Sequence, residues 1–257
     1  MPAESPDSED KGPVRRIVLG YSALLALTAG FVNAVALLIF ALPVGNLTAL
    51  TTQLGMKTAN PWLYEGHVLL AVLVGFFVGA VLAGVALPTP RQVVDSRAAA
   101  VLCLEAVFLL LAAAGVEETF VKNLITSSGI EAPAVQALFA AGALGLQNGL
   151  TSSFREMAVR TTHFTGTITD LGLIVGRSRT QGIDSFKATT LGVTLLLFLT
   201  GGAAGLLAGA RFGGYALLGP ALACIAMAAV ALWRSAGPRD RMASSPDREK
   251  RVPASEN

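Results

Sequence analysis

Six long runs of apolar residues, separated by short polar segments, dominate the pattern of this chain. They cover residues 17–42, 68–87, 98–116, 133–154, 188–210 and 212–233. An α-helix needs roughly 20 predominantly apolar residues to cross the hydrocarbon core of a bilayer, and each run is long enough. The pattern predicts an all-α, polytopic membrane protein with about six transmembrane helices and no sizeable soluble domain.

Composition agrees with this pattern and excludes several classes of protein. Hydrophobic residues make up 53% of the 257 residues and charged residues 14%, whereas soluble domains carry about 25% charged residues. The net charge of +2 gives no reason to expect a nucleic-acid partner. Two cysteines and two histidines are too few for a metal cluster, and no catalytic triad, zinc-hydrolase or phosphate-loop motif is present. We expect that the protein is not an enzyme, that it has no cofactor and that it lies in a lipid bilayer. The composition does not decide whether it forms a homo-oligomer.

The positive charges predict how the chain is oriented. With the N-terminus in the cytoplasm, 16 of the 19 Lys and Arg residues lie inside, and only Lys57, Lys122 and Arg211 lie outside. Short cytoplasmic loops carry such an excess of positive charge. The end segments, 1–14 and 235–257, are rich in Ser, Pro, Asp, Glu and Arg. The prediction is a multi-pass protein of the cell membrane with two disordered cytoplasmic tails.

Two halves of the chain share motifs in the same order. GFVNA at 30–34 matches GLQNG at 145–149, and NLTALTTQLG at 46–55 matches HFTGTITDLG at 163–172. The offsets are 115 and 117 residues, and the pair Gly75 and Gly79 matches Gly201 and Gly205 at an offset of 126. We therefore predict a duplication: a first repeat at 15–116, an outer loop at 117–132 and a second repeat at 133–234.

Three spans in each repeat would make the second copy enter the membrane from the opposite face. Such inverted repeats are typical of secondary transporters, whose solute site lies near the midplane. A duplicated scaffold without transport activity is the alternative. If residues 161–176 crossed the membrane fully, the repeats would have four spans each and would not be inverted.

Two Thr-rich segments, 43–56 and 161–176, occupy matching places in the repeats. Short polar segments at such places are the best sequence indication of a transporter site. We predict two half-helices or re-entrant elements, with interfacial helices as the alternative. Together with polar residues of the neighbouring spans, they give the candidate substrate-binding set: Asn33, Asn46, Thr48, Thr52, Gln53, Gln147, Asn148, His163, Thr165 and Thr169. Three amides of this set, Asn33, Gln147 and Asn148, lie within spans. The alternative role of these three side chains is to hold helices together.

Two acidic residues are candidates for coupling transport to an ion. Glu105 interrupts the third apolar run, where a charge costs at least ~2.5–3.5 kcal/mol. Its alternative role is that of a neutral acid bonded to a neighbouring helix. Asp170 lies in the second Thr-rich segment, with Arg160 as its candidate charge partner, unless both are solvated at the interface.

These motifs, with LEA at 104–106 and VRTTHFTGTITDLG at 159–172, resemble the YoaK-like family of small multispanning microbial membrane proteins. The resemblance covers roughly residues 19–233. Relatives in that family commonly have an acid where this chain has Asn33, and Thr-Gly-Asn where it has Thr48-Ala49-Leu50. The family is a domain of unknown function, so the resemblance implies an architecture and no reaction. We expect a secondary transporter or permease for a small solute, with a non-transporting membrane scaffold or partner subunit as the alternative.

Overall fold

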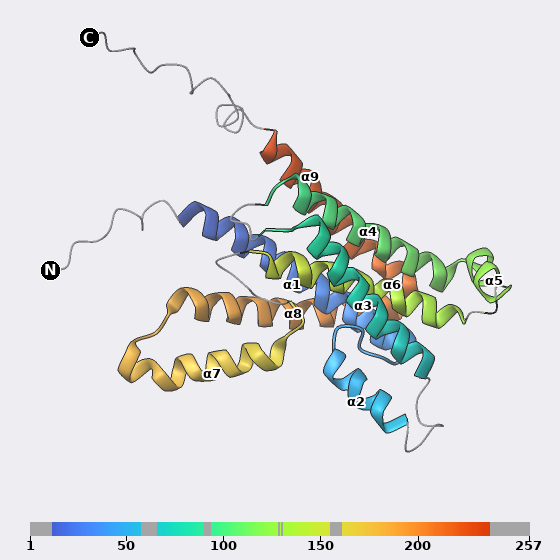
Figure 1. Ribbon diagram of the computed structural model, residues 1–257, viewed down its shortest axis with the longest axis horizontal. Coiled ribbons are helices and arrows are strands. Elements are labelled where there is room, and N and C mark those ends of the chain that lie inside the picture. The colour runs from blue at the N-terminus through green and yellow to red at the C-terminus, as the bar shows by residue number, and fades with distance from the viewer. Residues whose placement is uncertain are drawn as a thin grey trace, which may run out of the picture.

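The computed structural model describes residues 12–57, 66–89, 94–127, 129, 131–154 and 161–236, which form an all-α fold (Figure 1). Its helices are α1 (Gly12–Phe40), α2 (Leu47–Lys57), α3 (Gly66–Ala86), α4 (Ser96–Glu117), α5 (Thr119–Ser127), α6 (Ala132–Ser152), α7 (Phe164–Gln181), α8 (Ser185–Phe212), the 3₁₀ helix η1 (Gly213–Leu217) and α9 (Leu218–Ser235). The predicted tails lie outside the described residues, except for residues 12–14 and 235–236. Where the sequence predicts only an outer loop, the chain forms α5.

Four stretches of the described chain are long and apolar enough to cross a membrane, or up to five if the bent pair α5 and α6 forms one span. They are Leu19–Phe40, Gly66–Ala86, Ser96–Glu117 and Ser185–Ser235. The last one joins α8, η1 and α9. Helix α6 passes this test only together with α5, and its polar residues Gln136, Gln147 and Asn148 lower its hydropathy. The protein is a multi-pass membrane protein, although fewer spans stand out individually than the six predicted.

Large apolar side chains cover the outside of the long helices. Leu70, Phe77 and Val85 on α3 and Leu196, Leu199 and Leu207 on α8 are among those that are exposed. The inside contains small residues: most of the buried side chains in the middle of α6 are alanines and glycines. Lipid tails are as apolar as these side chains, so the hydrophobic effect does not drive the helices together within a bilayer. Close packing of small residues holds such helices together instead.

Glycines bring two pairs of helices, α3 with α6 and α1 with α8, into backbone contact. A Cβ atom at Gly79 would overlap the carbonyl oxygen of Gly142 on α6, and one at Gly201 would overlap that of Leu27 on α1. One turn further along α8, Gly205 lies against Phe31 in the same way. The contacts advance in the same direction on both helices, so α8 runs parallel to α1.

Polar contacts join the ends of α4, α6 and η1. The Gln136 amide of α6 donates to the carbonyl of Gly115 on α4. The Gly214 N–H group donates to the Glu117 carboxylate over 2.5 Å, and the Tyr215 hydroxyl donates to Glu118 over 2.8 Å. At the same level, His67 of α3 pairs with Glu131, the residue before α6. From this end α9 returns along α4 in the antiparallel direction.

Candidate functional site

A cavity of about 260 Å³ lies where the helices α2 and α7 begin. It is lined by Gly45, Asn46, Leu47 and Thr48 from the first half of the chain, and by Asn148, Thr162, His163, Phe164 and Thr165 from the second half. Figure 1 shows α2 and α7 diverging from this region. The structure thus brings together five of the ten predicted substrate-binding residues, from segments at least 100 positions apart in the chain.

Local sequence explains why both helices begin at the cavity. Before α2, the N–H group of Asn46 donates to the carbonyl of Pro43 over 3.1 Å, which forms a turn. The Asn46 side chain then caps the helix by accepting the N–H group of Ala49 over 3.2 Å. In α7, the first turn closes when the N–H group of Thr167 donates to the carbonyl of His163 over 3.2 Å.

Two amides hold the chain in front of these helices. The Asn33 Oδ1 atom of α1 accepts the N–H group of Gly45 over 2.9 Å. The Asn148 Oδ1 atom of α6 accepts the Thr162 hydroxyl over 3.3 Å. Asn33 itself is not among the lining residues, so its oxygen contributes by fixing the wall of the cavity.

Gln147 joins α1, α6 and the approach to α7 from a fully buried position. Its Nε2 atom donates to the Thr161 hydroxyl over 3.2 Å and also to the carbonyl of Leu25 on α1. This amide lies outside the cavity wall. Its contacts support the alternative role of the three amides, which is to hold helices together.

The cavity offers hydrogen-bond groups without any Asp, Glu, Lys or Arg among its lining residues. The first N–H groups of an α-helix have no partner within the helix, and the N-terminal end carries a partial positive charge. Thr48, Thr165 and the Asn46 and Asn148 amides add further donors and acceptors, whereas Leu47 and Phe164 are apolar. This chemistry suits a small solute with both hydrogen-bonding and apolar parts.

The remaining predicted residues of the two segments lie outside the cavity wall. Thr52 and Thr169 are exposed one turn further along α2 and α7, and their hydroxyls donate to the carbonyls of Thr48 and Thr165 over 3.0 and 2.8 Å. Gln53 is half-buried, and its Oε1 atom has no hydrogen-bond partner in the described part of the chain.

Glu105 is buried between α4 and α9 rather than in the cavity. It lies against the Cys224 thiol of α9, a weak donor, and neither carboxyl oxygen has another hydrogen-bond partner among the described residues. Among the described residues, hydrogen bonds therefore compensate only weakly for the removal of this carboxyl group from water. This is unusual for a buried acid and keeps Glu105 a candidate for protonation.

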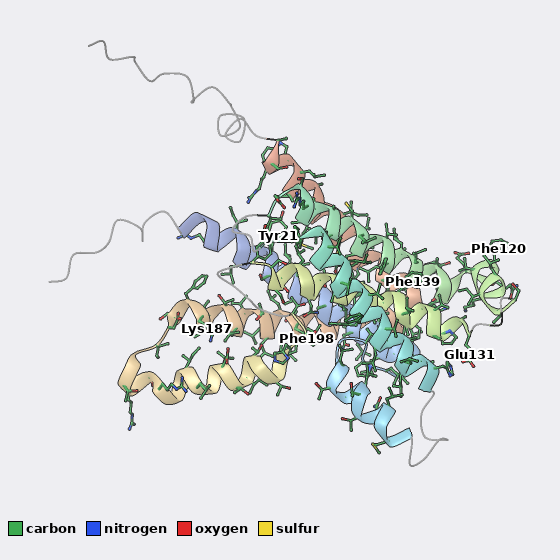
Figure 2. All side chains as sticks on the ribbon, viewed as in Figure 1. Tyr21, Phe120, Glu131, Phe139, Lys187 and Phe198 are labelled. Carbon is green, nitrogen blue, oxygen red and sulfur yellow. The ribbon has the colours of Figure 1, made fainter. Side chains whose placement is uncertain are left out.

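Asp170 forms a half-exposed ion pair over 3.1 Å with Lys187, which is labelled on α8 in Figure 2. Lys187, and not the predicted partner Arg160, is thus the cation seen beside it. Arg160 lies outside the described residues. Exposed pairs of this kind contribute about 0–1 kcal/mol, so the pair helps to hold α7 on α8 without requiring a functional role.

A comparison with protein families finds one that covers most of the chain. This family is DUF1275, described as "Protein of unknown function", and its model matches residues 21–230. The chain belongs to this family. No curated protein and no solved structure matches the chain. Membership in the DUF1275 family agrees with the resemblance noted from the sequence, and the match includes every residue of the cavity wall.

Sequence reasoning missed four lining residues of this DUF1275 protein: Gly45, Leu47, Thr162 and Phe164. One signal was available for two of them. Gly45 and Thr162 differ by 117 positions, the offset of the Thr-rich motifs. They also contact each other, since a Cβ atom at Gly45 would lie 3.1 Å from the methyl group of Thr162. Because glycine and threonine are different residue types, a search for identical or similar residues does not align these two positions.

Replacing Gln147 with methionine should lower the free energy of unfolding by about 1–3 kcal/mol, because the carbonyl of Leu25 and the Thr161 hydroxyl lose a buried donor. The measurement is thermal unfolding of the purified protein in detergent. Gln53→Met is the matched control: the same exchange at a half-buried amide should have little effect. Equal stability of both variants would show that Gln147 does not hold α6 to α1 and to Thr161.

Proposed function

We propose that this protein is a secondary transporter or permease for a small polar solute, which binds in the cavity where α2 and α7 begin. The observation that carries this proposal is the convergence of the N-termini of α2 and α7, which come from the two halves of the chain, on one polar cavity. Discontinuous helices of this kind form the solute site at the repeat interface of many transporters.

Six crossings account best for the packing directions. Helix α8 runs parallel to α1, and α3 runs parallel to α6, with Gly75 beside Leu138 and Gly79 beside Gly142. Helix α9 returns along α4, so the stretch Ser185–Ser235 forms a hairpin of two spans. Helices α1, α4 and α8 then cross one way, and α3, α6 and α9 cross the other way.

The contacts also support an inverted repeat, with a refined alignment. Gly145 of α6 lies against the carbonyl of Phe76, and Gly30 of α1 lies against that of Phe198. These two contacts match each other if α1 corresponds to α6 at an offset of 115 and α3 to α8 at 122. Gly79 then corresponds to Gly201, one helical turn away from the alignment that the sequence suggests.

The second pair of contacts fits the same two offsets. Gly79 lies against Gly142, and Gly201 lies against Leu27, which is 115 positions before Gly142. In both cases a contact between α3 and α6 has its counterpart between α8 and α1, at the same two offsets. A twofold relation between the repeats requires this correspondence. The relation supports a site at the repeat interface, because the cavity contains the contact between Gly45 and Thr162, residues related by the repeat.

The orientation of the charges supports cytoplasmic termini on the cell membrane. Arg16 stands just before the first span and Arg234 in the last turn of α9, so both lie at the end of the bundle where the chain begins and ends. Lys122 and Arg211 lie toward the other end, near α5 and η1. The positive-inside rule then assigns the termini to the cytoplasm.

Glu105 is the acid that we propose for proton coupling, in preference to Asp170. A buried carboxyl group with only a thiol beside it changes the packing of α4 against α9 when it gains or loses charge. Glu105→Gln should abolish the dependence of uptake on a proton gradient in reconstituted vesicles. Asp170→Asn, which removes a half-exposed charge, should leave that dependence intact. Coupling by Glu105 is wrong if the glutamine variant responds to the gradient like the wild type.

A thermal-stabilisation screen of the purified protein against small polar solutes tests binding directly. A solute present at 100 times its dissociation constant adds ~2.7 kcal/mol to the apparent stability. A true hit should lose its effect in variants of the cavity wall. A complete absence of hits across amino acids, sugars, organic acids, nucleosides and inorganic ions would count against a solute site.

A non-transporting scaffold or partner subunit is the second candidate, and one observation is compatible with it. Both Asn33 and Asn148 use a side-chain oxygen to fix the chain before a half-helix, which suits a static bundle as well as a binding site. A scaffold would keep water out of the cavity, so the accessibility of its wall separates the two functions.

A further inference from the structure

A groove of about 590 Å³ runs between α1 and α9, away from the cavity and on the outer face of the bundle. Its walls are apolar for most of its length, with Leu24, Leu27 and Val230 among the lining residues. The Tyr21 hydroxyl donates to the carbonyl of Met227 over 3.0 Å and joins the two helices at the floor of the groove (Figure 2).

One end of the groove is strongly positive. Arg16, just before the first span, and Arg234, in the last turn of α9, both line it. Both side chains are exposed, and neither guanidinium pairs with a carboxylate among the residues that the structure describes. Two cations without a described carboxylate beside them, at the membrane edge of an apolar groove, are complementary to an amphipathic anion.

The length of the groove matches one leaflet of a bilayer. Its lining on α1 extends from Arg16 to Thr28, which is about 18 Å at 1.5 Å per residue. Half of the ~30 Å hydrocarbon core is about 15 Å. A transmembrane helix of a second copy would need a groove of twice this length, whereas the acyl chain of a lipid in one leaflet fits.

The other half of the bundle shows that the groove is a gap in the packing. Helix α4 packs closely along α6, but α9 makes few contacts with α1. Under the repeat alignment, α1 corresponds to α6 and α9 to α4, so the same interface is closed in one half and open in the other. Gly20 contributes to the opening, because a Cβ atom there would meet nothing within 4 Å.

We propose that the groove between α1 and α9 binds one anionic phospholipid, with its phosphate headgroup between Arg16 and Arg234 and an acyl chain along Leu24, Leu27 and Val230. Basic pockets between membrane helices recognise anionic headgroups in this manner. The lipid fills the interface that close packing fills in the other half of the protein. This inference does not depend on transport.

The experiment is native mass spectrometry of the full chain, titrated with phosphatidylglycerol or with phosphatidylcholine as the zwitterionic comparison. The wild type should retain one phosphatidylglycerol and prefer it over phosphatidylcholine by at least about tenfold, as expected for two cations at an anionic headgroup. Arg16→Gln/Arg234→Gln should lose the preference. Gly20→Phe should lose the bound lipid, since the ring occupies the groove while both arginines remain.

Matched controls separate site binding from general effects. Arg177→Gln/Arg179→Gln removes the same charge from exposed positions on α7, and Gly84→Phe adds the same ring at an open position on α3. Both should bind phosphatidylglycerol like the wild type. Unchanged binding in either test variant overturns the proposal: in the arginine variant because the lipid would not be recognised by charge, and in Gly20→Phe because it would not occupy the groove. A wild type that shows no preference for phosphatidylglycerol also overturns it.

Discussion

Gly79→Leu and Gly201→Leu should each lower the free energy of unfolding by about 3 kcal/mol or more, enough to prevent recovery of most of the protein in folded form. In both cases the new side chain would begin inside a backbone carbonyl of the neighbouring helix, at Gly142 or at Leu27. A flexible side chain can move aside, but a helix backbone cannot do so without separating the whole pair. These two glycines therefore hold the two helix pairs on which the cavity depends.

The same helices provide controls for this prediction. A Cβ atom added at Gly84 on α3 or at Gly192 on α8 would have no neighbouring atom within 4 Å, so leucine is accommodated there. Leucine also has a higher helix propensity than glycine, by nearly 1 kcal/mol. Size-exclusion profiles and unfolding temperatures in detergent provide the measurement. If Gly79→Leu unfolds at the same temperature as Gly84→Leu, α3 and α6 are not in backbone contact.

Filling the cavity should weaken solute binding at least about tenfold, which corresponds to about 1.4 kcal/mol. Thr48→Trp and Thr165→Trp each add a large ring to the wall of a cavity of about 260 Å³. Both positions are exposed, so the ring displaces the solute rather than the core. The measurement is the thermal stabilisation by a solute that the screen identifies, recorded over a range of concentrations.

Thr52→Trp and Thr169→Trp are the matched controls for that experiment. They lie one turn further along the same two helices, are exposed and do not line the cavity. Their binding should match that of the wild type. If these two variants lose binding while the wall variants keep it, the solute binds along the outer turns of α2 and α7 instead.

Much of the architecture followed from the sequence because membrane helices are defined by the length of their apolar runs. The two Thr-rich segments were predicted as half-helices or, alternatively, as interfacial helices. They form α2, which is too short to count among the candidate spans, and α7, which is too polar. Thr48 and Thr165, which the Thr-rich motifs align with each other, both line one cavity.

Other features could not be predicted, for physical reasons. A run of Thr residues at four-residue spacing does not reveal which turn faces the cavity, and in α2 and α7 only the first turn does. The glycine pattern had a similar ambiguity. Gly201, Gly205 and Gly209 repeat every four residues, so the sequence matches Gly79 equally well at neighbouring turns. Only the contacts with α1 distinguish between these alignments.

The partners of the acidic residues were also hidden from the sequence. Asp170 pairs with Lys187, a residue of the next helix, because α7 folds back along α8. Glu105 meets Cys224 because α9 returns along α4, which requires the hairpin at η1. Contacts of this kind depend on how helices are arranged, and residue spacing along the chain does not contain that information.

Cysteine labelling of Thr48 and Thr165 in sealed vesicles tests the transport site most directly. The background carries Cys103→Ala and Cys224→Ser, and the reagent is a thiol label that does not cross the membrane. A solute site between inverted repeats predicts labelling at both positions from opposite faces, with protection by a bound solute. Complete protection of both positions in the absence of solute would contradict it and favour a sealed scaffold.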